Sequence, residues 1–254
     1  MLEVFKATIR HSRFAPSARR LYRRFWPLST AEKNERYDFE LVALMARVLR
    51  HDSTCIDVGA HTGAILQAML AHAPAGHHLA FEPIPRLAEG LRTRFPSVQV
   101  YQSALADRRG SVTFQHVVNA PGLSGLRRRE YPLGDETVET LTVSAERLDQ
   151  VVPATMPIAL IKVDVEGGEL QVFRGAVDTI RRCRPFIAFE HGLGAADYYG
   201  TTPAAVYDFL VSECGLKVML LARWLAGERP FSKARFVSHS EQGTDFFFLA
   251  YPEG

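Results

Sequence analysis

The feature that most constrains the fold of this 254-residue chain is a regular alternation of short apolar stretches with longer amphipathic stretches. Each apolar stretch has the length of a buried strand, and each amphipathic stretch repeats its apolar residues at helical spacing. The predicted strands lie, in chain order, at 54–59, 77–83, 98–104, 158–166 and 185–192. Because helices separate most of these strands, the pattern predicts right-handed crossover units in a parallel sheet, and therefore an α/β fold.

The alternation is interrupted in the middle of the chain. Stretches 111–117 and 139–145 read as two strands of an excursion around a loop rich in glycine, proline and arginine at 121–136. The remaining predicted elements are two helices and two closing strands, at 39–50, about 203–213, 216–221 and 245–252.

The first strand ends in the glycine-rich turn DVGAHTG at 57–63. Parallel sheets bind ligands beyond the carboxyl ends of their strands, where glycines let the backbone turn and approach a ligand. A nicotinamide-binding loop would need the three glycines of Gly-x-Gly-x-x-Gly, whereas this turn has only Gly59 and Gly63. Asp57 also disfavours a pyrophosphate, because a carboxylate repels phosphates. A nicotinamide oxidoreductase is therefore a disfavoured alternative.

The second and third strands end in residues that suit a nucleoside. Glu82 follows the glycine turn at roughly the 20-residue offset where such sheets bind a ribose diol. The alternative is that Glu82 caps the helix that begins near Pro85. Small residues at 103–107 leave room for a flat base, with a tight turn as the alternative.

The fourth and fifth strands end in acids. The fourth runs into KVDVEGGE at 162–169, and buried carboxylates are costly unless they are paired or bind a cation. Strand alternation would place Lys162, Asp164 and Glu166 on one face, so a Lys–Asp pair is the structural alternative. The fifth strand adds Glu190 and His191, whose imidazole titrates near neutral pH.

Together, these strand ends resemble those of the FkbM family of S-adenosylmethionine-dependent methyltransferases. The matching segments are IDVGAHTG (56–63), FEP (81–83), SALAD (103–107), IKVDVEGGE (161–169), FEHG (189–192) and TDFFFLA (244–250). The resemblance spans about 38–252. It implies a Rossmann-like class I methyltransferase sheet, mostly parallel, with helices on its flanks and one antiparallel strand, expected at 245–251, among its seven.

The resemblance also implies roles for single residues. Those expected to line the methionine part of the cofactor are Asp57, Gly59, Ala60, His61, Thr62 and Gly63. Those expected at the ribose are Glu82 and Pro83, and those at the adenine are Ser103, Ala104 and Asp107. Asp164 would lie near the reacting sulfonium, with Glu166 beside it. Relatives often carry Asn where this chain has His61, which matters little if the loop contacts the cofactor through its backbone.

A hydroxyl acceptor must be oriented and must lose a proton. Glu190 and His191 rank ahead of Glu166 and Asp164 as candidate bases, because Asp164 is expected to face the cofactor. The same acids could instead hold a divalent metal that orients the acceptor, and the sequence does not choose. The resemblance suggests a small-molecule acceptor, with a hydroxyl of the sugar or secondary-metabolite type.

A basic segment precedes the α/β domain. Residues 1–28 carry seven Lys or Arg residues against Glu3 alone, so we interpret 1–37 as a helical cap or lid on a methyltransferase domain at 38–254. Weak contact of 1–28 with a membrane surface or a nucleic acid is the alternative. The net charge of only +2 and the absence of an Asn/Asp-Pro-Pro-Tyr segment disfavour a nucleic-acid methyltransferase. The intact acids disfavour a non-catalytic, cofactor-binding relative.

Cysteines, histidines and apolar runs add exclusions. The three cysteines are too few and too scattered for a disulfide framework or a metal site. The histidines at 72–78 lie at the amino end of the second strand, away from the expected site, so they are not expected to bind metal. No apolar run reaches the about 20 residues of a membrane span, and no secretory signal is recognisable. A reduced, cytoplasmic protein is expected; its oligomeric state does not follow from the sequence.

Overall fold

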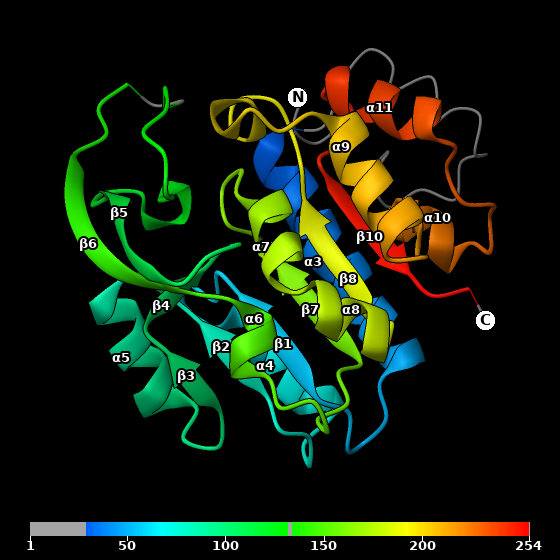
Figure 1. Cartoon of the computed structure of the whole chain (residues 1–254), viewed down its shortest axis with the longest axis horizontal. Helices are drawn as coiled ribbons and strands as arrows, with labels where there is room; N and C mark the ends of the chain where they lie inside the picture. Colours follow the sequence, from blue (N-terminus) through cyan, green and yellow to red (C-terminus); the bar gives the residue numbers. More distant parts are fainter. Residues whose placement is uncertain (1–28, 132–133, 254) are drawn as a thin grey trace, which may run out of the picture. The chain divides into compact units, whose positions relative to one another are not determined.

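The computed structural model describes residues 29–131 and 134–253 (Figure 1). The chain divides into two compact units, Met1–Phe39 and Glu40–Gly254. Most of the cap expected at 1–37, including the basic segment 1–28, lies outside the described residues and remains a prediction. The described part of the first unit starts helix α3 (Thr30–Val48). There Ser29 Oγ accepts from the Glu32 N–H at 3.3 Å and Glu32 Oε2 accepts from the Ser29 N–H at 3.0 Å, a reciprocal cap that explains the helix start.

The second unit is built on a seven-stranded sheet. Across the sheet its strands are β3 (Gln99–Tyr101), β2 (Leu79–Phe81), β1 (Cys55–Val58), β7 (Leu160–Val163), β8 (Phe186–Glu190), β10 (Phe247–Tyr251) and β9 (Lys217–Met219). Neighbours are parallel except at β10, which runs antiparallel to both β8 and β9. The predicted Rossmann-like sheet and its antiparallel closing strand are confirmed.

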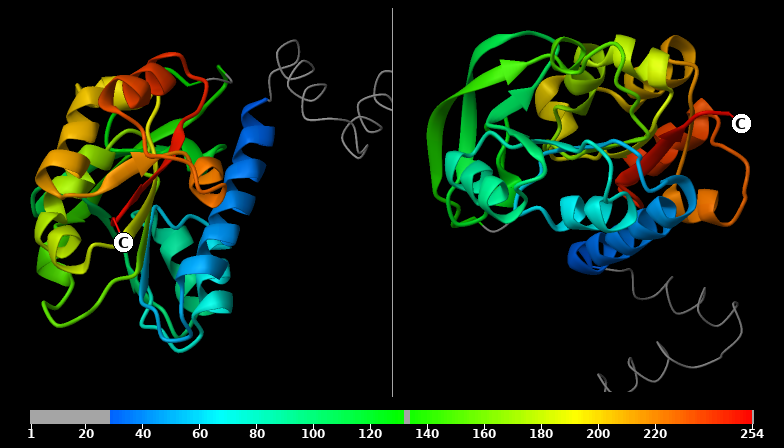
Figure 2. Two further views of the ribbon diagram at one scale, coloured as in Figure 1. Left: turned by 90° about the vertical axis from the view of Figure 1, so that its right-hand side faces the viewer. Right: turned by 90° about the horizontal axis from the view of Figure 1, so that it is seen from below.

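The central strands are apolar because helices cover both faces of the sheet. Ile56, Ile161 and Ile187 pair in register across β1, β7 and β8, and each is at most 2% exposed. Helix α4 (Ala64–His72) lies on one face, and α7 (Glu169–Gly175) and α8 (Val177–Cys183) lie on the other (Figure 2). The core therefore fixes the carboxyl ends of β1, β7 and β8 next to one another.

The other helices of the second unit are short. They are α5 (Pro85–Arg94), α6 (Leu148–Val151), α9 (Pro203–Tyr207), α10 (Leu221–Leu225) and α11 (Lys233–Glu241). The helix predicted at 203–213 is α9 followed by a π-helical turn, η3 (Asp208–Glu213). Neither α10 nor α11 was predicted, because helices of so few turns give too little periodicity to recognise.

One strand was predicted wrongly in its extent. The stretch 98–104 is not a single strand: β3 ends at Tyr101, and β4 (Ser103–Leu105) belongs to a second sheet of order β4-β6-β5. In that sheet β6 (Val138–Glu146) pairs with both β4 and β5 (Gly110–Val117), which confirms the predicted excursion. A run of strand-forming residues does not say which sheet it joins, so the change of sheet could not be read from periodicity. Segment 103–107 thus lies where the two sheets meet.

Two of the histidines at 72–78, His72 and His78, contact backbone groups. His78 Nδ1 accepts from the Cys55 N–H at 3.2 Å, and its Nε2 contacts Ala73 O at 2.8 Å, so both ring nitrogens are occupied. Cys55, Cys183 and Cys214 are free thiols. In the described part of the chain, no helix combines the length and the apolar character that a membrane span needs.

Candidate active site

The turn after β1 depends on residues with positive φ angles: Gly59 (74°), His61 (50°) and Gly63 (81°). The Gly59 N–H donates to Phe81 O at 3.0 Å, which ties the turn to the end of β2. A Cβ at Gly59 would lie 1.9 Å from the backbone oxygen of Asp164. Only glycine therefore lets the end of β1 pack against the end of β7.

Glu82 joins this turn to helix α5. It is 4% exposed; its Oε2 accepts from the His61 N–H at 2.8 Å and its Oε1 from the Ile84 N–H at 2.9 Å. Burial raises the pKa of Glu82, although the two backbone hydrogen bonds oppose the rise. Ile84 is the N-cap residue of α5, so the helix-start contact foreseen as the alternative role is present.

Lys162 is the buried cation of the site. Its Nζ donates to Gly59 O at 2.9 Å and lies 3.5 Å from Asp57 Oδ1 and 3.3 Å from Asp164 Oδ2. Burial alone would lower the pKa of Lys162, but the two carboxylates raise it above its ordinary value, so the ammonium stays charged. The Lys–Asp pairing considered from the sequence is therefore real. Of the two partners, Asp57 is 1% exposed, whereas the Asp164 side chain is 36% exposed and borders the site.

Three carboxyl groups meet at the ends of β7 and β8. One carboxylate oxygen from each of Asp164, Glu166 and Glu190 lies within 4.8 Å of the other two; we call these residues the acid cluster. Burial would raise the pKa of Asp164, but Lys162 and a hydrogen bond from Glu190 bring it below its ordinary value. Burial and the charge of Asp164 raise the pKa of Glu190 well above its ordinary value. These shifts favour the charged form of Asp164 and the protonated form of Glu190.

The turn after β7 explains the glycines and the third acid of the motif. β7 ends at Val163, so Glu166 is not on a continuing strand as predicted; it sits in a turn with φ 59°, which still brings it to Asp164. A Cβ at Gly167 would lie 2.5 Å from the backbone of Ala195. Glu169, 1% exposed, closes the turn: its Oε1 accepts from Gly167 N–H at 3.0 Å and Val165 N–H at 3.3 Å.

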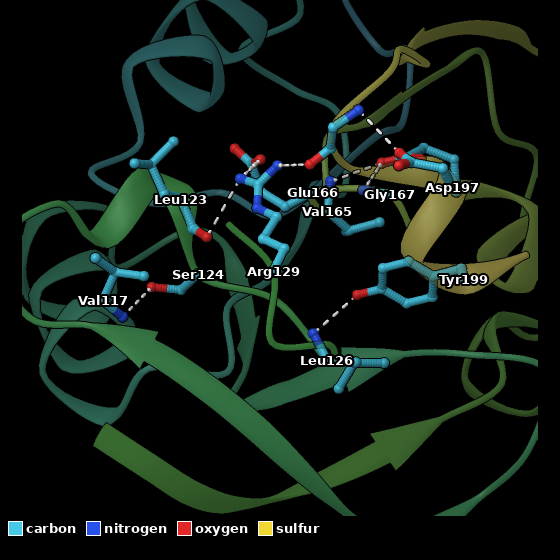
Figure 3. A network of polar contacts seen from close by, with 12 residues as sticks. Val117, Leu123, Ser124, Leu126, Arg129, Val165, Glu166, Gly167, Asp197 and Tyr199 are labelled. Carbon is cyan, nitrogen blue, oxygen red and sulfur yellow. Dashed lines mark hydrogen bonds and ion pairs between the residues drawn. The ribbon is translucent and has the colours of Figure 1, made fainter. Parts of the chain in front are cut away.

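A loop of the excursion lies over this turn (Figure 3). We call residues 118–131 the excursion loop. Within it Arg129 forms an ion pair with Glu166 and donates to Gly194 O at 3.1 Å. The hydroxyl of Tyr199, in the short 3₁₀ helix η2 (Ala196–Tyr199), accepts from the Leu126 N–H at 2.9 Å. Burial and the charge of Asp164 raise the pKa of Glu166 to about 8, against the opposing effect of Arg129.

His191 does not join the acid cluster. Side chains alternate at the end of a strand, and the His191 ring, 2% exposed, stacks on Phe236 at a centroid distance of 6.1 Å. Burial lowers the pKa of His191 to about 4, so the ring is neutral near pH 7. The structure thus brings Glu190 to Asp164 and leaves His191 in the apolar core.

The remaining residues expected at the cofactor differ in exposure. Ser103 is 4% exposed, and its Oγ has no hydrogen-bond partner among the described residues. Ala60, Pro83 and Ala104 are buried, Asp107 is half-buried and Thr62 is exposed. Ser103 is therefore the one buried side chain of segment 103–107 with an unused polar group.

Comparison with protein families identifies the family of this chain. The sequence model of the methyltransferase FkbM domain matches residues 57–218. The chain belongs to this family. It is therefore an S-adenosylmethionine-dependent methyltransferase, and the nicotinamide alternative falls away. The match contains the glycine turn, Glu82, the excursion and the acid cluster, and is shorter than the expected 38–252.

Individual relatives agree. The chain is 29% identical over 178 residues to the 2-O-methyltransferase NoeI of Sinorhizobium fredii (strain NBRC 101917 / NGR234), covering 63% of this chain and 72% of that protein. It is 28% identical over 148 residues to Methyltransferase 1 of Beauveria bassiana (strain ARSEF 2860), covering 50% and 59%. The crystal structure of methyltransferase FkbM from Methylobacillus flagellatus KT is similar in fold, with a TM-score of 0.52 at 14% identity. That likeness covers 84% of this chain and 48% of the crystallised chain.

Three residues of the site were not recognised from the sequence in the roles they take. Arg129 was considered only as part of the loop at 121–136, Tyr199 was not singled out, and Glu169 was one acid of a motif. These residues contact partners that are distant in the sequence or lie across a turn, so no spacing of residues in the sequence predicts the contacts. The one available signal was the presence of three acids with a single nearby lysine, which called for a second cation.

Proposed function

We propose that this methyltransferase transfers a methyl group to a hydroxyl oxygen of a small, polyhydroxylated acceptor, with Glu166 as the general base. The acid cluster carries this proposal, because it offers a proton acceptor at the carboxyl ends of β7 and β8. Methylation of oxygen is also what the printed name of the relative NoeI, a 2-O-methyltransferase, describes for that protein.

The residues at the ends of β1, β2 and β4 fit S-adenosylmethionine. The hydroxyl of Ser103 is buried and has no hydrogen-bond partner among the described residues. A carboxylate oxygen can accept more than one hydrogen bond, so Glu82 could hold a ribose diol and keep its two backbone partners. In this proposal the Gly59–Gly63 turn receives the methionine part, Glu82 the ribose and Ser103 the adenine. Asp57 remains a predicted ligand, although Lys162 already faces it.

When bound, S-adenosylmethionine supplies a methyl group on a positively charged sulfur. The chain must then orient the acceptor and take its hydroxyl proton. A carboxylate does this best when its pKa lies near the working pH, because it is then partly ionised and still binds a proton well.

Glu166 meets that requirement better than its neighbours. Its pKa of about 8 leaves part of the population ionised at neutral pH. The raised pKa of Glu190 favours its protonated form, and the lowered pKa of Asp164 makes that carboxylate a weak base. Asp164, partly exposed and charged, is placed instead to accept a hydrogen bond from the acceptor. Glu166 thus replaces Glu190 and His191, which ranked first on the sequence alone.

We propose that the reaction needs no divalent metal. Lys162 faces Asp164 and Arg129 faces Glu166, so two cations of the chain already balance the charged members of the acid cluster. The raised pKa of Glu190 favours its neutral form, which adds no charge for a cation to balance.

The test is transfer of a radiolabelled methyl group from S-adenosylmethionine to a panel of acceptors. Simple sugars and oligosaccharides should be labelled, and the product should resist mild base, as a methyl ether does and a methyl ester does not. Glu166→Gln should lower kcat by about 10²–10⁴-fold, the usual contribution of a general base, and should leave cofactor affinity by calorimetry nearly unchanged.

A matched control is Glu89→Gln, which removes an exposed carboxylate on α5 and should retain full activity. Labelling of RNA or protein in place of sugars would refute the acceptor class. Full activity of Glu166→Gln would refute the assignment of the base.

A further inference from the structure

Arg129 differs from the other arginines of its own loop. Arg127 and Arg128 are exposed, whereas the Arg129 side chain is 10% exposed. Its guanidinium pairs with Glu166 and donates to Gly194 O at 3.1 Å and Leu123 O at 3.4 Å. Several directional contacts hold this one cation against the acid cluster.

The excursion loop is itself tied down on both sides of Arg129. The Tyr199 hydroxyl accepts from the Leu126 N–H at 2.9 Å, and the Tyr198 hydroxyl accepts from the Glu130 N–H at 3.2 Å (Figure 3 shows the Tyr199 contact). A Cβ at Gly125 would approach the Tyr199 oxygen to 3.3 Å, so the loop lies close on η2 at this point. The position of the guanidinium is therefore set by the fold of the loop.

Glu166 faces an unequal set of charges. Carboxyl groups face it from three elements: Asp164 at the end of β7, Glu190 at the end of β8 and Glu169 at the start of α7. Arg129, from the excursion loop, is the cation that pairs with it among the described residues. The other nearby titratable groups act elsewhere: Lys162 on Asp57 and Asp164, His61 on Asp164, and Tyr199 beside Glu169 and Arg129.

We propose that Arg129 is a positioning residue that holds the Glu166 carboxylate in its proton-accepting form, so that the base is complete only when the excursion loop lies over the β7 turn. This inference rests on the proposed function, in which Glu166 takes the hydroxyl proton. Without Arg129, burial and the charges of Asp164 and Glu169 would act on Glu166 unopposed, and its charged form would be destabilised.

A structural role and a positioning role of Arg129 predict different behaviour of its variants. Arg129→Gln removes the charge and keeps a hydrogen-bonding side chain that can stay in the loop. Arg129→Lys keeps the charge but loses the fork that reaches several carbonyl oxygens. If the charge is what matters, Lys rescues; if anchoring of the loop is what matters, it does not. Arg128→Gln, an exposed arginine of the same loop, is the matched control.

The experiment measures the titration of Glu166 directly and the pH dependence of the rate separately. Carbon-13 NMR of glutamate side-chain carboxyls gives the Glu166 midpoint in the cofactor-free protein, assigned by the signal that Glu166→Gln removes. In Arg129→Gln the midpoint should rise by about one pH unit or more, the usual effect of losing an adjacent opposite charge. In Arg129→Lys and Arg128→Gln it should stay near the wild-type value.

Because the ionised carboxylate is the active form, kcat/KM for the acceptor should rise with pH, and in Arg129→Gln the rise should move to higher pH by the same amount. The variant should then be about tenfold slower than wild type at pH 7 and should approach it at high pH. An unchanged NMR midpoint in Arg129→Gln overturns the inference. So does a shifted midpoint with an unshifted rate profile. An enzyme that methylates no hydroxyl acceptor, while the NMR midpoint still shifts, instead locates the failure in the proposed function.

Discussion

Glu169 gives the sharpest test of how burial sets the charges of this site, and Glu169→Gln is the informative change. Burial raises the pKa of Glu169 to about 7 from an ordinary 4.5, even though its Oε1 accepts the N–H groups of Val165 and Gly167. Glutamine keeps an oxygen for those two N–H groups and removes the titrating proton. The change therefore isolates the cost of placing a charge at this position.

The sign and size follow from proton linkage. Between pH 4.5 and 7 the native state binds a proton at Glu169 that the unfolded chain has released, so stability falls as the pH rises through this range. The difference between the two pKa values corresponds to about 3 kcal/mol of stability in the protonated native state, and the wild-type protein has lost all of it above pH 8. Glu169→Gln has no titrating proton at this position, so its stability does not fall in this way. Relative to wild type, the variant should gain up to about 3 kcal/mol between pH 5 and 9.

Urea unfolding of the cofactor-free protein at pH 5, 6, 7, 8 and 9 measures this difference. Trp224, whose ring packs edge-on against Phe186 at 5.5 Å, is a suitable fluorescence reporter. Glu166 and Glu190 also have raised pKa values and titrate in both proteins. Glu169→Gln removes one neighbouring charge from each of them, which acts in the same direction as the expected gain at high pH. The exposed Glu89→Gln serves as the reference and should show no such trend. A constant difference between Glu169→Gln and wild type across this pH range would refute the reasoning.

Two further predictions concern the glycine turn and the charge balance of the site. Gly59→Ala should lower the free energy of unfolding by more than about 1 kcal/mol and abolish S-adenosylmethionine binding measured by calorimetry, because its Cβ would lie 1.9 Å from Asp164 O at a left-handed φ. The control Gly90→Ala, in open space on α5, should leave stability unchanged or raise it. Equal behaviour of the two variants would contradict this explanation. Exhaustive chelation with EDTA should leave kcat unchanged; activity lost on chelation and restored by Mg²⁺ would show that Lys162 and Arg129 do not suffice to balance the acid cluster.

The fold could be predicted from the sequence because its main signals are local. Strands that are apolar on both faces, separated by helical periodicity, imply a parallel sheet covered on both sides, and the structure has one. The prediction failed where a decision depended on a distant partner. Nothing within 98–104 reveals that Ser103 pairs with Ser144 of the excursion rather than continuing β3. Likewise α10 and α11 are defined by what they pack against more than by their own few turns.

The gathering of the expected cofactor residues at one edge was also predictable, because in a parallel sheet the carboxyl ends of neighbouring strands meet at one edge whatever the loops do. Their role at the cofactor stays a prediction. The sequence placed Gly59, Glu82 and Asp164 at that edge, and the structure has them within one network of backbone contacts. What it could not give is their division of labour. Glu82 is a candidate ribose ligand, and its two backbone hydrogen bonds also link the glycine turn to the start of α5.

The acid cluster shows why residue type and strand position do not suffice to identify a base. Asp164, Glu166 and Glu190 all stand at strand ends, and from the sequence any of them, or His191, could take a proton. Their differences come from what each faces: Lys162 lowers the pKa of Asp164, Arg129 moderates that of Glu166, and Glu190 pairs with no cation in the described chain. Arg129 arrives from 37 residues away on a loop outside the main sheet. In the proposed mechanism the choice of base therefore depends on the excursion, the part of the chain that the parallel-sheet pattern constrains least. A change in that loop would then alter the reaction without touching any strand-end residue.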